Sequence, residues 1–125
     1  MAGTSPTQRT LKYLRDRGYV VAVTERWNAF AKIRQDLFGC LDLVALDLAM
    51  KRIIGIQTTS TPHIKDRIDK IKKLPEAKAW VECGGALLVI GWAKRGARGE
   101  KKTWTPKVVR LALVKGDWWG FDEPQ

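Results

Sequence analysis

The dominant pattern along the chain is a pair of apolar stretches, residues 39–47 and 52–59, separated by a short turn. Both stretches carry apolar side chains at odd and even positions, which is typical of central strands covered on both faces. Because the turn is short, we expect an antiparallel hairpin that reverses near Ala49. In that pairing, Asp42 lies opposite Ile56 or Gln57.

Further strands are predicted on either side of this hairpin. Residues 19–24 are β-branched and apolar, residues 86–92 form a buried run, and residues 108–115 are apolar again. Between the first strand and the hairpin, residues 29–38 indicate a connection that is either a loop or one helical turn. The aromatic residues expected to seal the core or a subunit interface after the last strand are Trp118, Trp119 and Phe121.

Three helices are predicted from capping signals and apolar spacing. Ser5 followed by Pro6 is typical of a helix start, and Gly18 of a helix end, so a helix is expected up to Arg17. A second helix follows Pro62, and a third spans residues 75–82. The apolar stripe of the second helix consists of Ile64, Ile68, Ile71 and Leu74.

The order of these elements predicts one α/β domain over residues 1–125, with a mixed central sheet flanked by helices. A chain of 125 residues is long enough for one core. No apolar run reaches the roughly 18 residues needed to span a bilayer, so we expect no membrane partner and a cytoplasmic location. The isolated Cys40 and Cys83 are expected to be small, reduced residues rather than metal ligands.

Two polar side chains interrupt the apolar hairpin. Asp42 lies near the start of its first strand and Gln57 near the end of its second, so the two should converge with Thr59 beside them. Carboxylate and amide oxygens are ligands of hard cations such as Mg²⁺. The alternative is that both are satisfied polar residues at strand ends.

Glu25, at the end of strand 19–24, is expected to supply a second carboxylate to the Asp42 site from a neighbouring strand. Its alternative is a surface ion pair with Arg26 or Lys32. Asp36 is a further candidate, but Asp42 is preferred because it lies on the strand. For Asp36 we expect a local cap or an ion pair.

The chain has a formal net charge of +10, which favours an acidic polymer, first of all DNA, as its partner. A Gly-rich basic loop is predicted over residues 94–107, where Trp104 could stack on a base or fold back on the body. A solvated basic surface is the alternative. The candidate nucleic-acid contacts are Lys32, Arg34, Arg67, Lys94, Arg95, Arg98, Lys101, Lys102 and Trp104.

Residues 39–46 and 54–59 resemble the two motif strands of the PD-(D/E)XK nuclease superfamily, in its small Holliday-junction-resolvase-like type common in phages. The resemblance covers about residues 8–92 and implies a restriction-endonuclease-like αβββαβ core. Gln57 replaces the usual acid and Thr59 the usual Lys. In some relatives the role of that Lys moves to the following helix, which makes Lys65 the first candidate here and Arg67 the second.

What the resemblance implies is a Mg²⁺-dependent DNA endonuclease, with Mn²⁺ able to substitute, acting on branched, single-stranded or otherwise structured DNA. Asp42, Gln57 and Glu25 would surround the metal, and Lys65 would assist. A homodimer is expected because related resolvases act as dimers. The alternatives are a non-catalytic DNA-binding protein on a degenerate nuclease fold and, third, a basic RNA-binding protein.

Overall fold

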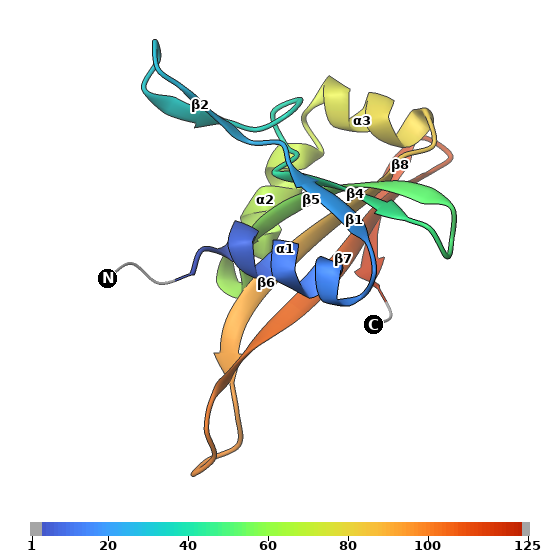
Figure 1. Cartoon of the computed structure of the whole chain (residues 1–125). Coiled ribbons are helices and arrows are strands. Elements are labelled where there is room, and N and C mark those ends of the chain that lie inside the picture. Colours follow the sequence, from blue (N-terminus) through green and yellow to red (C-terminus); the bar gives the residue numbers. More distant parts are fainter. Residues whose placement is uncertain (1–3, 124–125) are drawn as a thin grey trace.

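The computed structural model describes residues 4–123 as a six-stranded sheet with helices on both faces, beside a small two-stranded hairpin (Figure 1). The helices are α1 (Pro6–Asp16), α2 (Ile64–Ile71) and α3 (Pro75–Glu82), with a 3₁₀ turn, η1 (Thr61–His63), before α2. The strands are β1 (Val20–Val23), β2 (Arg26–Asn28), β3 (Ile33–Gln35), β4 (Leu43–Asp47), β5 (Arg52–Ser60), β6 (Ala86–Arg95), β7 (Thr103–Val114) and β8 (Asp117–Asp122).

The large sheet has the order β1-β4-β5-β6-β7-β8, and only β5 and β6 pair in parallel. Parallel pairing requires a crossover, and η1, α2 and α3 supply it. The predicted hairpin of β4 and β5 is confirmed, with Leu43 opposite Ile56. Asp42 therefore lies one position beyond this pair, opposite Gln57.

Helix α1 covers one face of the sheet, and α2 and α3 cover the other (Figure 1). The start of α1 follows the sequence signal, since the N–H of Gln8 donates to Ser5 Oγ at 3.2 Å and Pro6 opens the helix. On the α1 face, Leu11 and Leu14 pack against the sheet, and on the other face Ile71 is fully buried. These two apolar layers explain why β5 and β6 carry apolar side chains on both faces. No helix within residues 4–123 combines the length and the apolar character needed to cross a membrane.

The hairpin of β2 and β3 was not expected, since residues 29–38 indicated a loop or a helical turn. Asn28 stabilises the reversal: its Oδ1 accepts hydrogen bonds from the N–H groups of Phe30 and Ala31, both at 3.0 Å. Its Nδ2 donates to Gln35 Oε1 at 3.2 Å across the pair. This turn chemistry at Asn28 overrides the weak helical pattern of the segment. In Figure 1 the hairpin projects from the body at the upper left.

The basic loop is shorter than predicted. Strand β6 continues to Arg95 and β7 begins at Thr103, so only residues 96–102 remain outside the strands, rather than 94–107. Backbone pairing extends both strands beyond their buried parts, and hydropathy does not reveal such pairing. The strands end in a tip that points downward in Figure 1.

The aromatic residues after β7 form an additional edge strand, β8, which pairs antiparallel with β7. Trp118 packs against the core on the α2–α3 side, as expected. Trp119 and Phe121 are instead 58% and 47% exposed, so they do not seal the core. Trp119 and Phe121 follow Trp118 at odd spacing along β8, so their side chains point to the opposite face of the sheet.

Candidate metal centre

Asp42 is buried directly before β4, and hydrogen bonds from β5 fix its side chain. Its Oδ2 accepts hydrogen bonds from Gln57 Nε2 at 2.8 Å and, at 2.8 and 3.1 Å, from the N–H and Oγ1 of Thr58. The expected convergence of the acid and the amide is therefore present. However, the amide nitrogen faces the carboxylate, so Gln57 acts in this arrangement as a support for Asp42.

Glu25 reaches Asp42 from the neighbouring strand through backbone contacts. The N–H groups of Thr24 and Glu25 both donate to the backbone carbonyl of Asp42, at 2.8 and 3.3 Å. Thr24 Oγ1 donates to the backbone carbonyl of Leu41 at 2.8 Å, which further holds the segment of Thr24 and Glu25 against the segment of Leu41 and Asp42. Glu25 is thus placed beside Asp42 as the sequence predicted, with a half-buried carboxylate.

Asp36 joins the same cluster because the chain turns back sharply after β3. Phe38 and Gly39 both have positive φ, 56° and 78°, and Leu37 pairs with Leu41 in an isolated bridge. The N–H of Gly39 donates to the carbonyl of Asp36 at 3.1 Å. This turn returns Asp36 to Asp42.

The three carboxylates of Glu25, Asp36 and Asp42 each offer an oxygen within 4.8 Å of the others. Sequence reasoning ranked Asp36 below Asp42 as an alternative, whereas the structure brings both together. Had the pairing of β2 with β3 been recognised, it would have indicated that Asp36 lies next to Glu25. Arg26 pairs with Gln35, so Glu25 and Asp36 occupy the next positions at its base.

The pKa of Asp42 is raised to about 7, and burial is the largest cause. The neighbouring Asp36 and the negative charge of Glu25 contribute to this rise, whereas the hydrogen bond from the Thr58 N–H opposes it. A carboxylate cluster of this kind favours a proton or a cation in its centre. All three groups are hard oxygen donors, which suit Mg²⁺ or Mn²⁺.

A cavity of about 510 Å³ adjoins the carboxylates. The three carboxylates line it together with Gln57 to Ser60, and the N-terminus of α1 lines it through Pro6 and Thr7. A hydrogen bond of 3.0 Å between the hydroxyls of Thr7 and Thr58 attaches α1 to β5 at this point. The cationic side chains that line the cavity are Arg34, Arg67 and Lys70, with His63 beside them.

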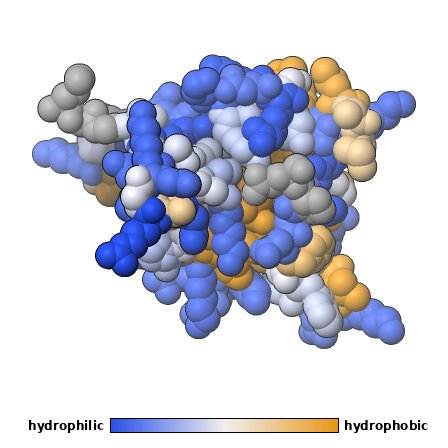
Figure 2. Space-filling view, turned by 90° about the horizontal axis from the view of Figure 1, so that it is seen from below, coloured by the Kyte–Doolittle hydropathy of each residue, from blue (hydrophilic) through white to orange (hydrophobic). Residues whose placement is uncertain are grey.

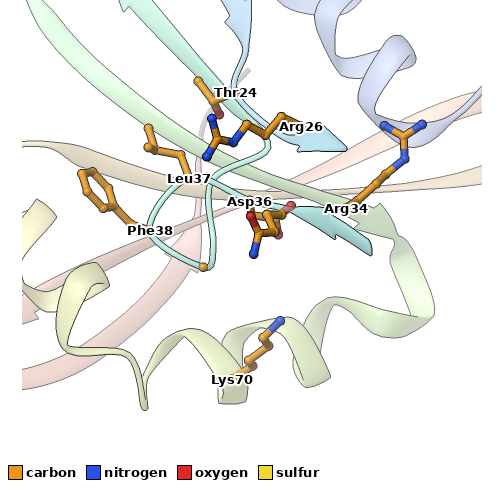
Figure 3. A pocket seen from close by; sticks show the side chains of 9 residues that line it. Thr24, Arg26, Arg34, Asp36, Leu37, Phe38 and Lys70 are labelled. Carbon is orange, nitrogen blue, oxygen red and sulfur yellow. The ribbon is translucent and has the colours of Figure 1, made fainter. Parts of the chain in front are cut away.

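A second cavity adjoins the first and shares Arg34, Asp36 and Lys70 with it. Figure 3 shows Lys70 on its helix extending toward the segment that carries Asp36. Arg34 Nη1 lies 3.7 Å from Glu25 Oε1. The acidic cluster therefore lies between cations from the small hairpin and from α2.

Lys65, the first candidate for the missing motif lysine, does not line either cavity. Its side chain is 88% exposed, and Nζ lies 3.8 Å from Asp69 Oδ2, one turn along α2. Arg67 and Lys70 lie on the side of α2 that faces the cavity. The helical repeat puts Lys65 on one flank of the apolar stripe and Arg67 and Lys70 on the other, but it does not indicate which flank faces the cavity.

The predicted nucleic-acid contacts fall into two projecting regions and the cavity rim. Lys32 lies in the turn of the small hairpin with a φ of 55°, and Arg34 follows on β3. Lys94 and Arg95 lie at the end of β6. The exposed cations of the tip at residues 96–102 are Arg98, Lys101 and Lys102. Figure 2, seen from below, shows a mainly hydrophilic surface with apolar residues in a central strip and at one side.

Trp104 folds back on the body, the alternative that the sequence had left open. The Arg9 guanidinium lies 3.8 Å from its ring centroid, and Lys94 Nζ lies 5.5 Å away. These contacts join β7 to α1 and place the Arg9 guanidinium over the indole, whose residue stays 44% exposed.

No protein-family model matches the chain, and no curated protein matches its sequence.

Proposed function

We propose that the protein is a Mg²⁺-dependent DNA endonuclease with a PD-(D/E)XK-type core, in which Mn²⁺ can substitute. The observation that carries this proposal is the convergence of Glu25, Asp36 and Asp42 beside a cavity lined by cations. The sheet order and the crossover helices are compatible with a restriction-endonuclease-like core. The net charge of +10 supports DNA as the substrate.

The residues present fit a divalent metal ion by the chemistry of their donors. Glu25, Asp36 and Asp42 would hold the ion, while Gln57 and Thr58 hold Asp42 in place. When bound, such an ion supplies positive charge to the phosphate oxygens and acidifies a water molecule. This assignment adds Asp36 to the ligands expected from the sequence and gives Gln57 a positioning role.

The chain itself contributes binding and charge compensation. Arg67 and Lys70 from α2 neutralise the charge that develops on the phosphate during hydrolysis, which is the role of the lysine that Thr59 replaces. Arg34 pairs with Glu25 in the protein alone and is available to a phosphate when Glu25 binds a cation. The cations at the tip of β6 and β7 bind the DNA backbone farther away.

The decisive experiment is a plasmid-nicking assay with Mg²⁺, Mn²⁺ or EDTA. Asp42→Asn and Asp36→Asn should each remove metal-dependent nicking while leaving DNA binding in place. The control is Asp117→Asn, an exposed acid at the start of β8, which should cleave like the parent. Cleavage that survives in Asp42→Asn would overturn the assignment. DNA binding without cleavage under every metal would favour a DNA-binding protein on a degenerate nuclease fold.

A further inference from the structure

The small hairpin of β2 and β3 exposes large apolar side chains to solvent. Trp27 is 59% exposed, Ile33 is half exposed, and Phe30 at the tip is fully exposed. Asn28 holds the turn that presents Phe30, through its two backbone contacts. Exposed aromatic side chains on a fixed projection contribute nothing to the core and are typical of binding surfaces.

The charge of this hairpin favours a polyanion. Residues 26–35 contain Arg26, Lys32 and Arg34 and no acidic residue. Against a second copy of this chain the same hairpin would meet like charge. A nucleic acid can bind both kinds of side chain, because its phosphates attract the cations and its bases stack on the aromatic rings.

The hairpin is also continuous with the candidate metal centre. Trp27 pairs with Arg34, and one pair beyond Arg26–Gln35, at the base, lie Glu25 and Asp36. Because side chains alternate along a strand, Glu25, Trp27, Arg34 and Asp36 share one face of the ribbon. Two residues along a strand span about 7 Å, so Trp27 lies roughly one nucleotide step from the carboxylates.

We propose that Trp27 stacks on an unpaired base next to the phosphate that is cleaved, and that Phe30 extends this surface along a single strand. The ligand class is single-stranded DNA, whether free or as an unpaired arm of a branched molecule. Duplex DNA fits less well because its base faces are covered by stacking. This inference rests on the proposed function, since it names the substrate of the same site.

The test measures binding in EDTA, where no cleavage occurs, by fluorescence anisotropy at one fixed salt concentration. The probes are labelled oligothymidine, an abasic strand of the same length and a duplex. Trp27→Ala should weaken oligothymidine binding by about 5- to 150-fold, Phe30→Ala should also weaken it, and Trp27→Phe should restore most of the affinity. Trp119→Ala is the matched control, because Trp119 is 58% exposed on β8 at the far edge of the sheet.

The abasic strand separates stacking from charge. For that probe Trp27→Ala should bind like the parent, whereas Arg34→Ala should lose affinity for both strands. Equal losses on both strands, or equal effects of Trp27→Ala and Trp119→Ala, would overturn the inference. A change of oligomeric state in Trp27→Ala by sedimentation would also overturn it and assign the hairpin to a second copy. This test measures binding and the nicking assay measures cleavage. Failure of the stacking inference can therefore be distinguished from failure of the nuclease proposal.

Discussion

Asp36 and Asp42 come from different segments of the chain, yet each offers a carboxylate oxygen within 4.8 Å of the other and of Glu25. One oxygen of Asp42 already accepts three hydrogen bonds from Gln57 and Thr58. Three neighbouring carboxylates repel one another, so without a cation one of them, Asp42, holds a proton. A divalent ion has to displace that proton, and this competition makes both stability and metal affinity depend on pH.

The stability of the metal-free protein should contain a contribution from the raised pKa of Asp42. The folded state keeps this proton up to about pH 7, whereas the unfolded chain releases it near its ordinary value of 3.8. The contribution is therefore fully present below about pH 4 and is lost as the pH rises through 7. Asp42→Asn, whose amide can donate to Asp36, should be more stable than the parent at pH 8 by a few kcal/mol, at about 1.4 kcal/mol per pKa unit.

Urea denaturation in EDTA at pH 5 and pH 8 measures this difference. The gain in the free energy of unfolding of Asp42→Asn over the parent should be larger at pH 8. A difference that is the same at both pH values would show that Asp42 titrates normally.

Affinity for Mn²⁺ should rise with pH because binding releases the shared proton. Below the Asp42 pKa of about 7 the association constant should increase roughly tenfold per pH unit, and above it the increase should level off. Calorimetry in buffers of different ionisation enthalpy measures both the affinity and the protons released. An affinity that does not change between pH 6 and pH 8 would contradict the shared proton.

The cations of α2 should differ sharply in their effect on cleavage. Lys70→Ala should lower kcat roughly 10²- to 10³-fold if Lys70 stabilises charge on the phosphate, because its side chain lines the cavity. Lys65→Ala, on the same helix but paired with Asp69, should cleave like the parent. The reverse result in a single-turnover assay would return the role to Lys65.

The close approach of η1 and α2 to β6 should depend on Gly91. A Cβ at this position would lie 2.9 Å from the backbone Cα of Thr61 and 2.5 Å from Ile64 Cδ1. Since a backbone atom cannot move aside freely, Gly91→Ala should destabilise the protein by about 1–3 kcal/mol and displace the cations of α2 from the cavity. Gly120→Ala, whose Cβ would meet side-chain atoms alone, Leu111 Cδ2 at 3.3 Å and Val109 Cγ1 at 3.7 Å, is the control. Thermal denaturation and kcat together report the two effects.

The sequence was most informative where periodicity and burial agree. The apolar stretches predicted β4 and β5 as a central hairpin with Asp42 opposite Ile56 or Gln57, and the observed register places it opposite Gln57. Caps and apolar spacing predicted the three helices. These features depend on local chemistry and on a two-residue or 3.6-residue repeat, both of which are readable along the chain.

Segments that bury little were less predictable. The hairpin of β2 and β3 depends on the side chain of Asn28, and the length of β6 and β7 depends on backbone pairing beyond the core. Hydropathy carries no signal for either. Hydropathy likewise does not reveal the contact of Trp104 with Arg9, because the two residues lie far apart in sequence.

By itself the sequence determined the α/β class and the central hairpin, because two apolar stretches joined by a short turn can pair in only one way, and it made Glu25 a candidate neighbour of Asp42. Only the tertiary structure decided that Asp36 completes the carboxylate cluster, that the amide nitrogen of Gln57 supports Asp42, and that Lys70 rather than Lys65 lines the cavity. The physical reason is that these relationships depend on turns with positive φ and on how a helix is rotated against the sheet. Such features are set by contacts between distant segments and leave no period in the sequence.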